Sequence, residues 1–201
     1  MGAVPKVTVR TLVRRAIGGS RLCGDRMRAQ ALHLRFAGIV VHPHARLGRG
    51  AQVDIAEGAR LVIGPGVIGR DVCIQVARGA SVVLNGSVVG RGSVIVARES
   101  ILIQPGAMIA EMCVIRDSDH VRTDAGAIDE RVHTSAPVVI SEHAWLAATV
   151  IVLKGVTVGR SATVGAGAVV TRSVPACATV VGVPARETRS PRHTEQTHVD
   201  R

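Results

Sequence analysis

Aromatic residues are almost missing from this chain of 201 residues. It contains one tryptophan, Trp145, one phenylalanine, Phe36, and no tyrosine, although 47% of its residues are hydrophobic. Rings are the largest hydrophobic groups of ordinary cores, so the core of this chain must be built almost entirely from aliphatic side chains. The abundance of aliphatic residues also excludes an intrinsically disordered chain. We therefore expect one folded domain built from small hydrophobic side chains.

Cysteine motifs and long apolar runs are also lacking. The four cysteines, Cys23, Cys73, Cys113 and Cys177, lie far apart and form no CxxC pair, so no metal site or disulfide framework is expected. No apolar run is long enough to cross a bilayer, and the N-terminus lacks the apolar core of a signal peptide. These absences predict a cytoplasmic protein with reduced thiols.

Positive charge is concentrated in the first residues. Of the formal net charge of +10, residues 1–38 carry +7. Apolar residues recur there at helical spacing from Val9 to Ile17, and a second helical run is expected from Asp25 to Phe36. Such a basic arm can bind an anionic membrane surface or can cover the open end of the fold, and the sequence leaves both open. Nucleic-acid binding is not expected, because no aromatic residues interleave with the arginines.

Aliphatic residues recur every six positions in the C-terminal half. Neither an α-helix nor a flat strand has this period, so the chain must turn a corner every few residues. Four positions after each of these aliphatic residues there is a small or β-branched residue. Glycines lie where the chain must turn. The pattern predicts an all-β fold, a parallel β-helix with a narrow aliphatic core. The six repeating residues are Ile140, Leu146, Val152, Val158, Val164 and Val170.

Weaker repeats extend this pattern towards the N-terminus. Val83, Val89, Ile95 and Ile101 keep the six-residue step, and Ile103, Ile109 and Ile115 resume it after a shift. We expect an N-terminal arm over residues 1–47, the β-helix over 48–186 and a polar tail over 187–201. The repeat stops at residues 117–137, where a solenoid has no structural need for a polar segment. A loop at this place is predicted to be functional.

The segment from Ile140 to Pro175 resembles the hexapeptide-repeat acyltransferases, most closely the sugar O-acetyltransferases that act on maltose, galactosides and capsular polysaccharides. The resemblance is close from about Asp117 to Arg186, looser from about Gly48 to Arg116, and absent before that. It implies a left-handed β-helix with three short parallel strands in each coil. It also implies a homotrimer with sites between subunits, and acetyl-CoA as the acyl donor without a metal.

The segment Asp117-Ser-Asp-His120 is similar to the D-x-D-H signature of this family, whose histidine is the catalytic base. A neutral imidazole can take the proton of a sugar hydroxyl as that hydroxyl attacks the thioester. Asp117 or Asp119 would orient His120, and the sequence leaves open which one. The resemblance also nominates the N–H of Ala148 as the donor that stabilises the oxyanion. His133, in the same loop, is the rival base.

The resemblance further implies a groove for acetyl-CoA past the last coils. One departure lies within it: the family usually has glycine where this chain has Ala147. The added methyl group would narrow the channel beside the thioester or change the acyl group that is accepted. The residues expected to bind the cofactor are Trp145, Ala147, Ala166, Thr171, Arg172 and Arg186, the last on a phosphate.

These residues predict transfer of an acetyl group from acetyl-CoA to a hydroxyl of a sugar, a glycan precursor or a glycosylated natural product. Two alternatives keep the same fold: a serine or amino-sugar acetyltransferase, and a non-catalytic hexapeptide-repeat scaffold. A γ-class carbonic anhydrase would need histidines spaced to meet at a zinc ion. No suitable pair exists among His120, His133 and His143.

Overall fold

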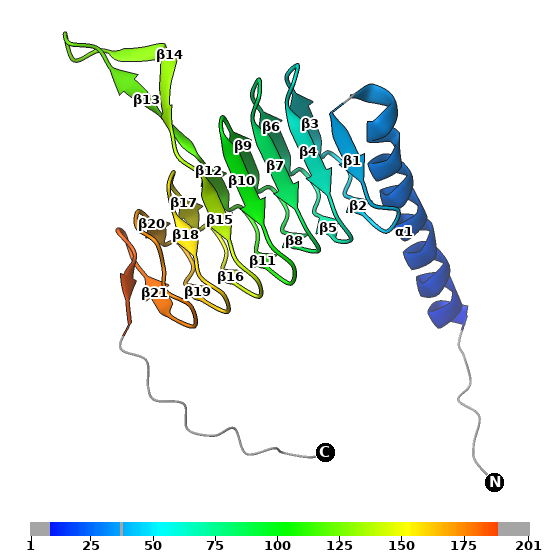
Figure 1. Cartoon of the computed structure of the whole chain (residues 1–201). Helices are drawn as coiled ribbons and strands as arrows, with labels where there is room; N and C mark the ends of the chain where they lie inside the picture. The colour runs from blue at the N-terminus through cyan, green and yellow to red at the C-terminus, as the bar shows by residue number, and fades with distance from the viewer. Residues whose placement is uncertain (1–8, 37, 189–201) are drawn as a thin grey trace.

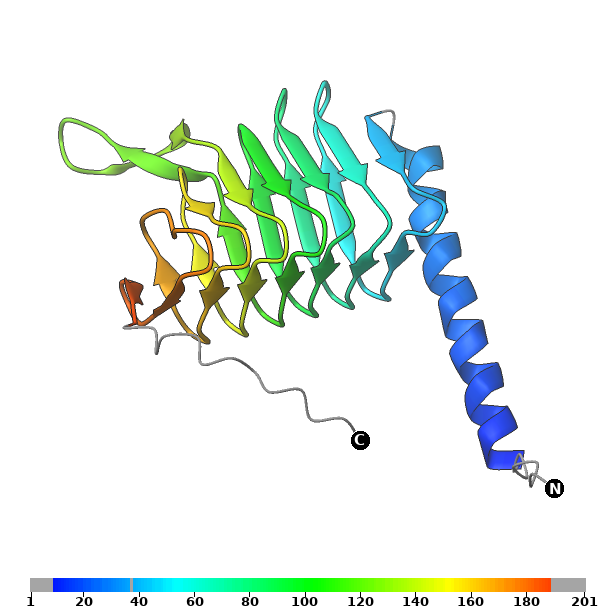
Figure 2. The same ribbon diagram turned by 60° about the horizontal axis from the view of Figure 1, so that its bottom comes forward.

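The computed structural model describes residues 9–36 and 38–188. Three parallel sheets wind into a left-handed β-helix, with the long helix α1 (Val9–Arg35) at its N-terminal end. An antiparallel hairpin of β13 (Ser118–Arg122) and β14 (Ile128–Ser135) projects from the coils, as Figures 1 and 2 show. The fold predicted from the six-residue repeat and the family resemblance is confirmed.

Each coil contributes one short strand to each sheet. Sheet A contains β1 (Ile39–Val41), β4 (Arg60–Ile63), β7 (Ser81–Leu84), β10 (Ser100–Ile103), β15 (Val138–Ile140) and β18 (Thr157–Val158). Sheet B contains β2 (Arg46–Leu47), β5 (Val67–Ile68), β8 (Val88–Val89), β11 (Met108–Ile109), β16 (Trp145–Leu146), β19 (Thr163–Val164), β21 (Thr179–Val181) and β22 (Arg186–Glu187). Sheet C contains β3 (Gln52–Ile55), β6 (Cys73–Val76), β9 (Val94–Ala97), β12 (Val114–Arg116), β17 (Ile151–Val152) and β20 (Val169–Val170).

The repeating aliphatic residues form the core. All six from Ile140 to Val170 are at most 1% exposed, and Cys113 is fully buried among them. The six-residue step is wrong at Val83, which faces outward between the buried Val82 and Leu84. The error has a physical cause, because β7 is four residues long and turns two residues inward instead of one.

Coil length explains why the repeat weakens towards the N-terminus. Leu47 pairs with Ile68 and Ile68 with Val89, a step of 21 residues from 47 to 68 and from 68 to 89. Leu146 pairs with Val164, a step of 18 residues from 146 to 164, which is three hexads. The first coils are therefore wider, and their sequence no longer has a strict six-residue period.

Helix α1 is continuous through Gly18 and Gly19, where the sequence predicts a break between two helical runs. Its C-terminal half covers the open end of the first coil, with Ala29 only 1% exposed. An open sheet edge leaves N–H and C=O groups without partners, and this half of the helix supplies some of them. The contacts are Arg28 Nε donating to the Leu47 carbonyl (3.0 Å), Gln30 Nε2 donating to the His42 carbonyl (3.0 Å), and the Val41 N–H donating to the His33 ring (3.3 Å).

The β-helix begins at Ile39, before the boundary that the sequence places at residue 48. The first turn of this coil, between β1 and β2, runs through His42-Pro43-His44 instead of through glycines, so the sequence shows no clear repeat there. The N-terminal half of α1 stands clear of the β-helix (Figures 1 and 2). No helix in residues 9–36 or 38–188 is long and apolar enough to cross a membrane. The first eight residues of the expected arm, and residues 189–201 of the expected tail, lie outside the described residues.

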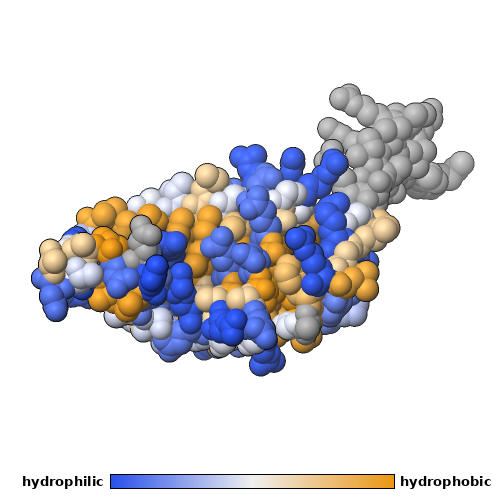
Figure 3. Space-filling model, turned by 90° about the horizontal axis from the view of Figure 1, so that it is seen from above, coloured by the Kyte–Doolittle hydropathy of each residue, from blue (hydrophilic) through white to orange (hydrophobic). Residues whose placement is uncertain are grey.

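The outer faces of the sheets are partly apolar. Val88, Met108 and Trp145 lie in register on the outer face of sheet B and are 44%, 51% and 46% exposed. On the side that faces upward in Figure 1, away from sheet B, hydrophobic residues also reach the surface between hydrophilic ones (Figure 3). An apolar stripe of this kind is typical of a surface that another protein surface covers.

Candidate functional site

The polar segment that interrupts the repeat forms a β-hairpin. Strands β13 (Ser118–Arg122) and β14 (Ile128–Ser135) pair antiparallel, and the hairpin projects from the corner between sheets C and A (Figure 1). The chain leaves the coils after β12 and returns at Ala136, whose N–H donates to the Asp117 carbonyl (2.9 Å). The expected loop is thus an ordered element with fixed strand register.

Asp117 anchors the base of this hairpin. Its side chain is fully buried, and its two carboxylate oxygens accept the N–H groups of Arg98 and Glu99, each at 2.8 Å. In the preceding coil the equivalent bond runs from the Ala77 N–H to the Ala97 carbonyl (2.8 Å). The Asp117 carboxylate therefore replaces the carbonyl that is lost where the chain leaves the coil. Bonds from N–H groups to a carboxylate are stronger than those to a neutral acceptor.

Replacing Asp117 by alanine is expected to lower the free energy of unfolding by about 2 to 4 kcal/mol, because two N–H groups at the base of the hairpin lose the buried carboxylate that accepts them. Chemical denaturation of the purified variant measures this, and limited proteolysis should show earlier cleavage in residues 118–135. Asp124→Ala, at an exposed position of the hairpin, is the matched control and should change stability by less than about 0.5 kcal/mol. Equal stability of the two variants would contradict the anchoring role.

His120 and His133 face each other across the hairpin. They are directly paired in the strand register, and their ring centroids lie 4.2 Å apart at an angle of 46°. The strand register shifts between His120 and Val121, as it does at a β-bulge. The His120 Nδ1 atom lies 3.3 Å from the Asp129 carbonyl oxygen. Because a carbonyl only accepts, this contact places the proton on Nδ1 and leaves Nε2 as the basic nitrogen.

Both aspartates of the D-x-D-H segment have partners other than His120. Asp117 is held by the two N–H groups described above, and Asp119 pairs with Lys154, with 3.2 Å between Oδ2 and Nζ. Among the described residues, neither carboxylate bonds to the His120 ring. The main-chain carbonyl of Asp129 occupies the orienting position in this structure.

The environment of His133 favours its neutral form. Partial desolvation, then the positive charge of Arg98, then that of His120 hold the pKa of His133 below its ordinary value of 6.5. Because the pKa of His133 is lower in the folded state than in the unfolded state, protonation of this ring destabilises the fold. The free energy of unfolding is therefore unaffected above the ordinary pKa of 6.5 and decreases as the pH falls below that value. The His133 imidazole is therefore neutral more often near pH 7 than an unperturbed imidazole would be.

In an NMR titration we expect the His133 ring to have a pKa below 6.5. Arg98→Gln should raise that pKa, because a nearby positive charge is removed. Arg160→Gln, on another corner of the β-helix, is the control and should leave it unchanged. A His133 pKa that is the same in both variants would contradict the role of Arg98.

The residues expected to bind the cofactor fall into two groups. Ala147, Ala148 and Ala166 lie on the turn between sheets B and C, where the Ala147 N–H donates to Val164 (2.9 Å) and the Gly167 N–H donates to the Ala148 carbonyl (3.0 Å). No described backbone carbonyl accepts the Ala148 N–H. Trp145 lies next to this turn on the outer face of sheet B.

The second group lies at the C-terminal end. Arg172 and Arg186 line one pocket of about 290 Å³, together with Ser173 and Glu187. Thr171 immediately precedes Arg172 on the turn between sheets C and A and is exposed. Two arginines that converge on one pocket can bind a phosphate group.

His120 and Ala148 of one chain lie on different corners. Strands β12 and β17 are parallel neighbours in sheet C, with Val114 opposite Ile151. Ala148 precedes β17, whereas the hairpin follows β12, so the two lie at opposite ends of these strands. Five residues of extended chain separate the corners by about 15 Å. A site that contains both groups therefore needs two copies of the chain.

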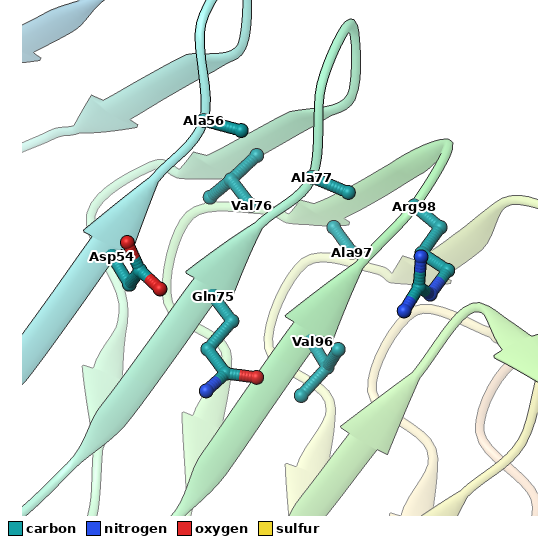
Figure 4. A pocket seen from close by; sticks show the side chains of 8 residues that line it. All are labelled: Asp54, Ala56, Gln75, Val76, Ala77, Val96, Ala97 and Arg98. Carbon is teal, nitrogen blue, oxygen red and sulfur yellow. The ribbon is translucent and has the colours of Figure 1, made fainter. Parts of the chain in front are cut away.

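A pocket on the outer face of sheet C was not expected from the sequence. It has a volume of about 220 Å³ and is lined by Asp54, Gln75, Val96 and Arg98, among others, from neighbouring coils (Figure 4). Arg98 connects it to the hairpin, because its charge affects His133. The sequence signal for it is the polar residues Asp54 and Gln75, which occupy outward positions of β3 and β6. In residues 9–36 and 38–188, no group of His, Cys, Asp and Glu is arranged to hold a metal ion.

Comparison with curated proteins places a short segment of the chain among acyltransferases. No protein-family model matches the chain. A stretch of 70 residues is 41% identical to the 2,3,4,5-tetrahydropyridine-2,6-dicarboxylate N-acetyltransferase of Staphylococcus aureus. This match covers 33% of the present chain and 29% of that protein, so the chain spans less than a third of the length of this relative.

Solved structures share the fold over most of the chain. The polysialic-acid-specific acetyltransferase NeuO covers 78% of this chain and 71% of its own, with a TM-score of 0.66 and 21% identity. A variant of the N-acyltransferase AntD from Bacillus cereus was solved with dTDP-4-amino-4,6-dideoxyglucose and coenzyme A. Its match covers 80% of this chain and 89% of its own, with a TM-score of 0.67 and 18% identity. A hexapeptide-repeat acetyltransferase from Vibrio cholerae, solved with acetyl coenzyme A, covers 95% of this chain and 94% of its own, with a TM-score of 0.56 and 19% identity. The chain thus has the fold of the hexapeptide-repeat acetyltransferases, as the resemblance predicts.

Proposed function

We propose that the protein is an acetyl-CoA-dependent acetyltransferase that acts on a hydroxyl of a sugar or glycan. The observation that carries this proposal is His120 at the break in the repeat, held by its Nδ1 so that Nε2 is free to accept a proton. The solved relatives with CoA or acetyl-CoA bound support the choice of cofactor. A scaffold has no need for a hairpin with two paired imidazoles.

In the proposed reaction, His120 Nε2 takes the proton of the acceptor hydroxyl as its oxygen attacks the thioester carbon. The carbonyl oxygen becomes an oxyanion, which the N–H of Ala148 stabilises because it has no other backbone acceptor in the described chain. When the intermediate collapses, the carbon–sulfur bond breaks and the CoA thiolate takes the proton from the imidazolium. The products are an acetyl ester and the free thiol of CoA.

The cofactor would lie along the turn between sheets B and C. Ala147 and Ala166 offer main-chain groups to the pantetheine, and Trp145 lies beside them with 46% of its surface exposed. Thr171 and Arg172 would contact the outer end of the cofactor, and Arg186 a phosphate. The shared pocket of Arg172 and Arg186 supports this assignment.

We infer that the active assembly is a homotrimer with sites between subunits. The support is the separation of His120 from Ala148 within one chain. The apolar stripe of Val88, Met108 and Trp145 gives a second copy a surface to cover. The Asp129 carbonyl would keep His120 oriented while the hairpin reaches the neighbouring subunit.

An amine acceptor is the second candidate. Two of the relatives described above, the tetrahydropyridine-dicarboxylate enzyme and AntD, are N-acyltransferases. The same base and oxyanion donor serve an amine, provided that its nitrogen is neutral when it attacks. Trp145 and Ala148 would have the same roles in both reactions.

An assay of CoA thiol release, over a panel of sugars, nucleotide sugars, amino sugars and serine, tests this proposal. Product treated with hydroxylamine separates the candidates, because an ester is cleaved and an amide is not. We expect a hydroxylamine-labile product. No turnover on any member, with acetyl-CoA bound, would favour the scaffold alternative.

The place of action is part of the same proposal. Acetyl-CoA as donor favours the cytoplasm. Attraction of residues 1–38 to an anionic membrane surface stays a prediction, since the structure gives the C-terminal half of α1 a capping role instead.

A further inference from the structure

Three exposed arginines stack on one corner of the β-helix. Arg49, Arg70 and Arg91 each occupy the turn between sheets B and C in the first three coils, and the strands β2, β5 and β8 that precede them pair in register. Main-chain bonds join consecutive turns, from the Asp71 N–H to the Arg49 carbonyl (3.1 Å) and from the Gly92 N–H to the Arg70 carbonyl (2.9 Å). We refer to these three residues as the arginine row.

Within residues 9–36 and 38–188, no member of the arginine row forms an ion pair. The carboxylate of Asp71, which follows Arg70, lies against Gly50 and is not in an ion pair. By contrast, the exposed Arg78 on another corner pairs with Glu57 at 3.1 Å. Coils are stacked about 4.8 Å apart, so like charges in register repel each other. A self-repelling row that the fold does not require is expected to serve an anionic ligand.

The position of the row relates it to the candidate reaction centre. The same turn position is filled in the following coils by Glu111, Ala148 and Ala166. Ala148 is the proposed oxyanion donor, and Ala166 lies one coil further towards the C-terminus, where the cofactor is proposed to run. The arginine row therefore lies on the opposite, N-terminal side of Ala148. One coil, which carries Glu111 at this turn position, separates the two, so an extended acceptor would have to place its acidic groups over the arginines and a neutral part over Glu111.

We propose that the arginine row binds the acidic part of the acceptor, an oligosaccharide whose carboxylates repeat along its length. This inference rests on the proposed function and names the acceptor class. Each guanidinium can bind one carboxylate with two parallel bonds. The row would then fix the register of the glycan and present one hydroxyl between Ala148 and His120 of a neighbouring subunit.

The surroundings of the row favour an acidic glycan over a nucleic acid. Single-stranded nucleic acids bind through aromatic side chains on which their bases stack. The chain has two such rings; Phe36 lies in the helical cap, and Trp145 lies on the outer face of sheet B, in the proposed cofactor groove. The row itself is flanked by glycines and Asp71, none of which offers a surface on which a base could stack.

Fluorescence anisotropy with a labelled galacturonic acid oligomer tests the proposal on the full-length protein. The triple variant Arg49→Gln, Arg70→Gln, Arg91→Gln should bind it at least about tenfold more weakly than the unaltered protein. The control variant Arg60→Gln, Arg78→Gln, Arg160→Gln removes the same charge from exposed positions elsewhere and should bind within about twofold. A neutral galactose oligomer of equal length should bind neither protein measurably. Circular dichroism establishes that both variants are folded.

The outcomes separate this proposal from the proposed function. Equal weakening in both triple variants, or equal binding of single-stranded DNA, would overturn the arginine row as a glycan site. If the row variant acetylates neutral sugars like the unaltered protein and no oligouronide binds, the row proposal fails and the function stands. If the oligouronide binds through the row but no acetyl transfer occurs, the row stands and the function fails.

Discussion

His120→Ala is expected to lower kcat by about a hundredfold to a thousandfold, because a positioned general base contributes about that much. Binding of acetyl-CoA should persist, since the cofactor is assigned to the turn between sheets B and C and to the C-terminal pocket. The hairpin should also remain folded, because its base is held by Asp117 and not by the imidazole. Steady-state kinetics at saturating substrate, with CoA affinity measured separately, provide the readout.

His133→Ala and His44→Ala are the matched controls for this loss. His44 is exposed at the far end of the β-helix and should have no effect. His133→Ala should have a smaller effect than His120→Ala, through the altered environment of His120. If His120→Ala keeps more than about a tenth of the activity while His133→Ala loses it, His133 is the base.

Much of the fold could be predicted from residues that repeat at fixed spacing. The series from Ile140 to Val170 reports the coils directly, because each coil there contains 18 residues, from Leu146 to Val164. Val83 could not be placed, since strand length in the wider N-terminal coils depends on how neighbouring coils pack. The start at Ile39 was hidden for the same reason, because the first coil is completed by a helix that has no repeat of its own.

Only part of the candidate site could be predicted from the sequence. The hairpin and His120 follow from the break in the repeat and from the D-x-D-H resemblance. The role of Asp117 in the structure depends on Arg98 and Glu99, which belong to the preceding coil and are brought close only by stacking. The arginine row has a sequence signal, but its spacing is not six residues. The pair Gly-Arg recurs at 48–49, 69–70 and 90–91, which is the spacing of the wider coils.

Mixing two inactive variants is expected to restore activity if each site is shared between subunits. His120→Ala removes the base, and Ala166→Trp, at an exposed turn position, blocks the proposed cofactor channel. In one chain these residues lie on opposite corners of the β-helix, so a mixed trimer can contain a site with an intact His120 from one subunit and an intact Ala166 from the next. Random assembly after denaturation and refolding of equal amounts should return about a quarter of the unaltered activity.

The double variant, carrying both substitutions in one chain, is the control for this mixture. Co-refolded with unaltered protein, it should also leave about a quarter of the sites intact, because each site still needs one unaltered group from each of two neighbours. A site within one chain gives a different pattern. The two single variants would then stay inactive when mixed. The double variant mixed with an equal amount of unaltered protein would keep about half of the unaltered activity. Light scattering should at the same time show three copies of the 21.0 kDa chain, and an active monomer would contradict the shared site.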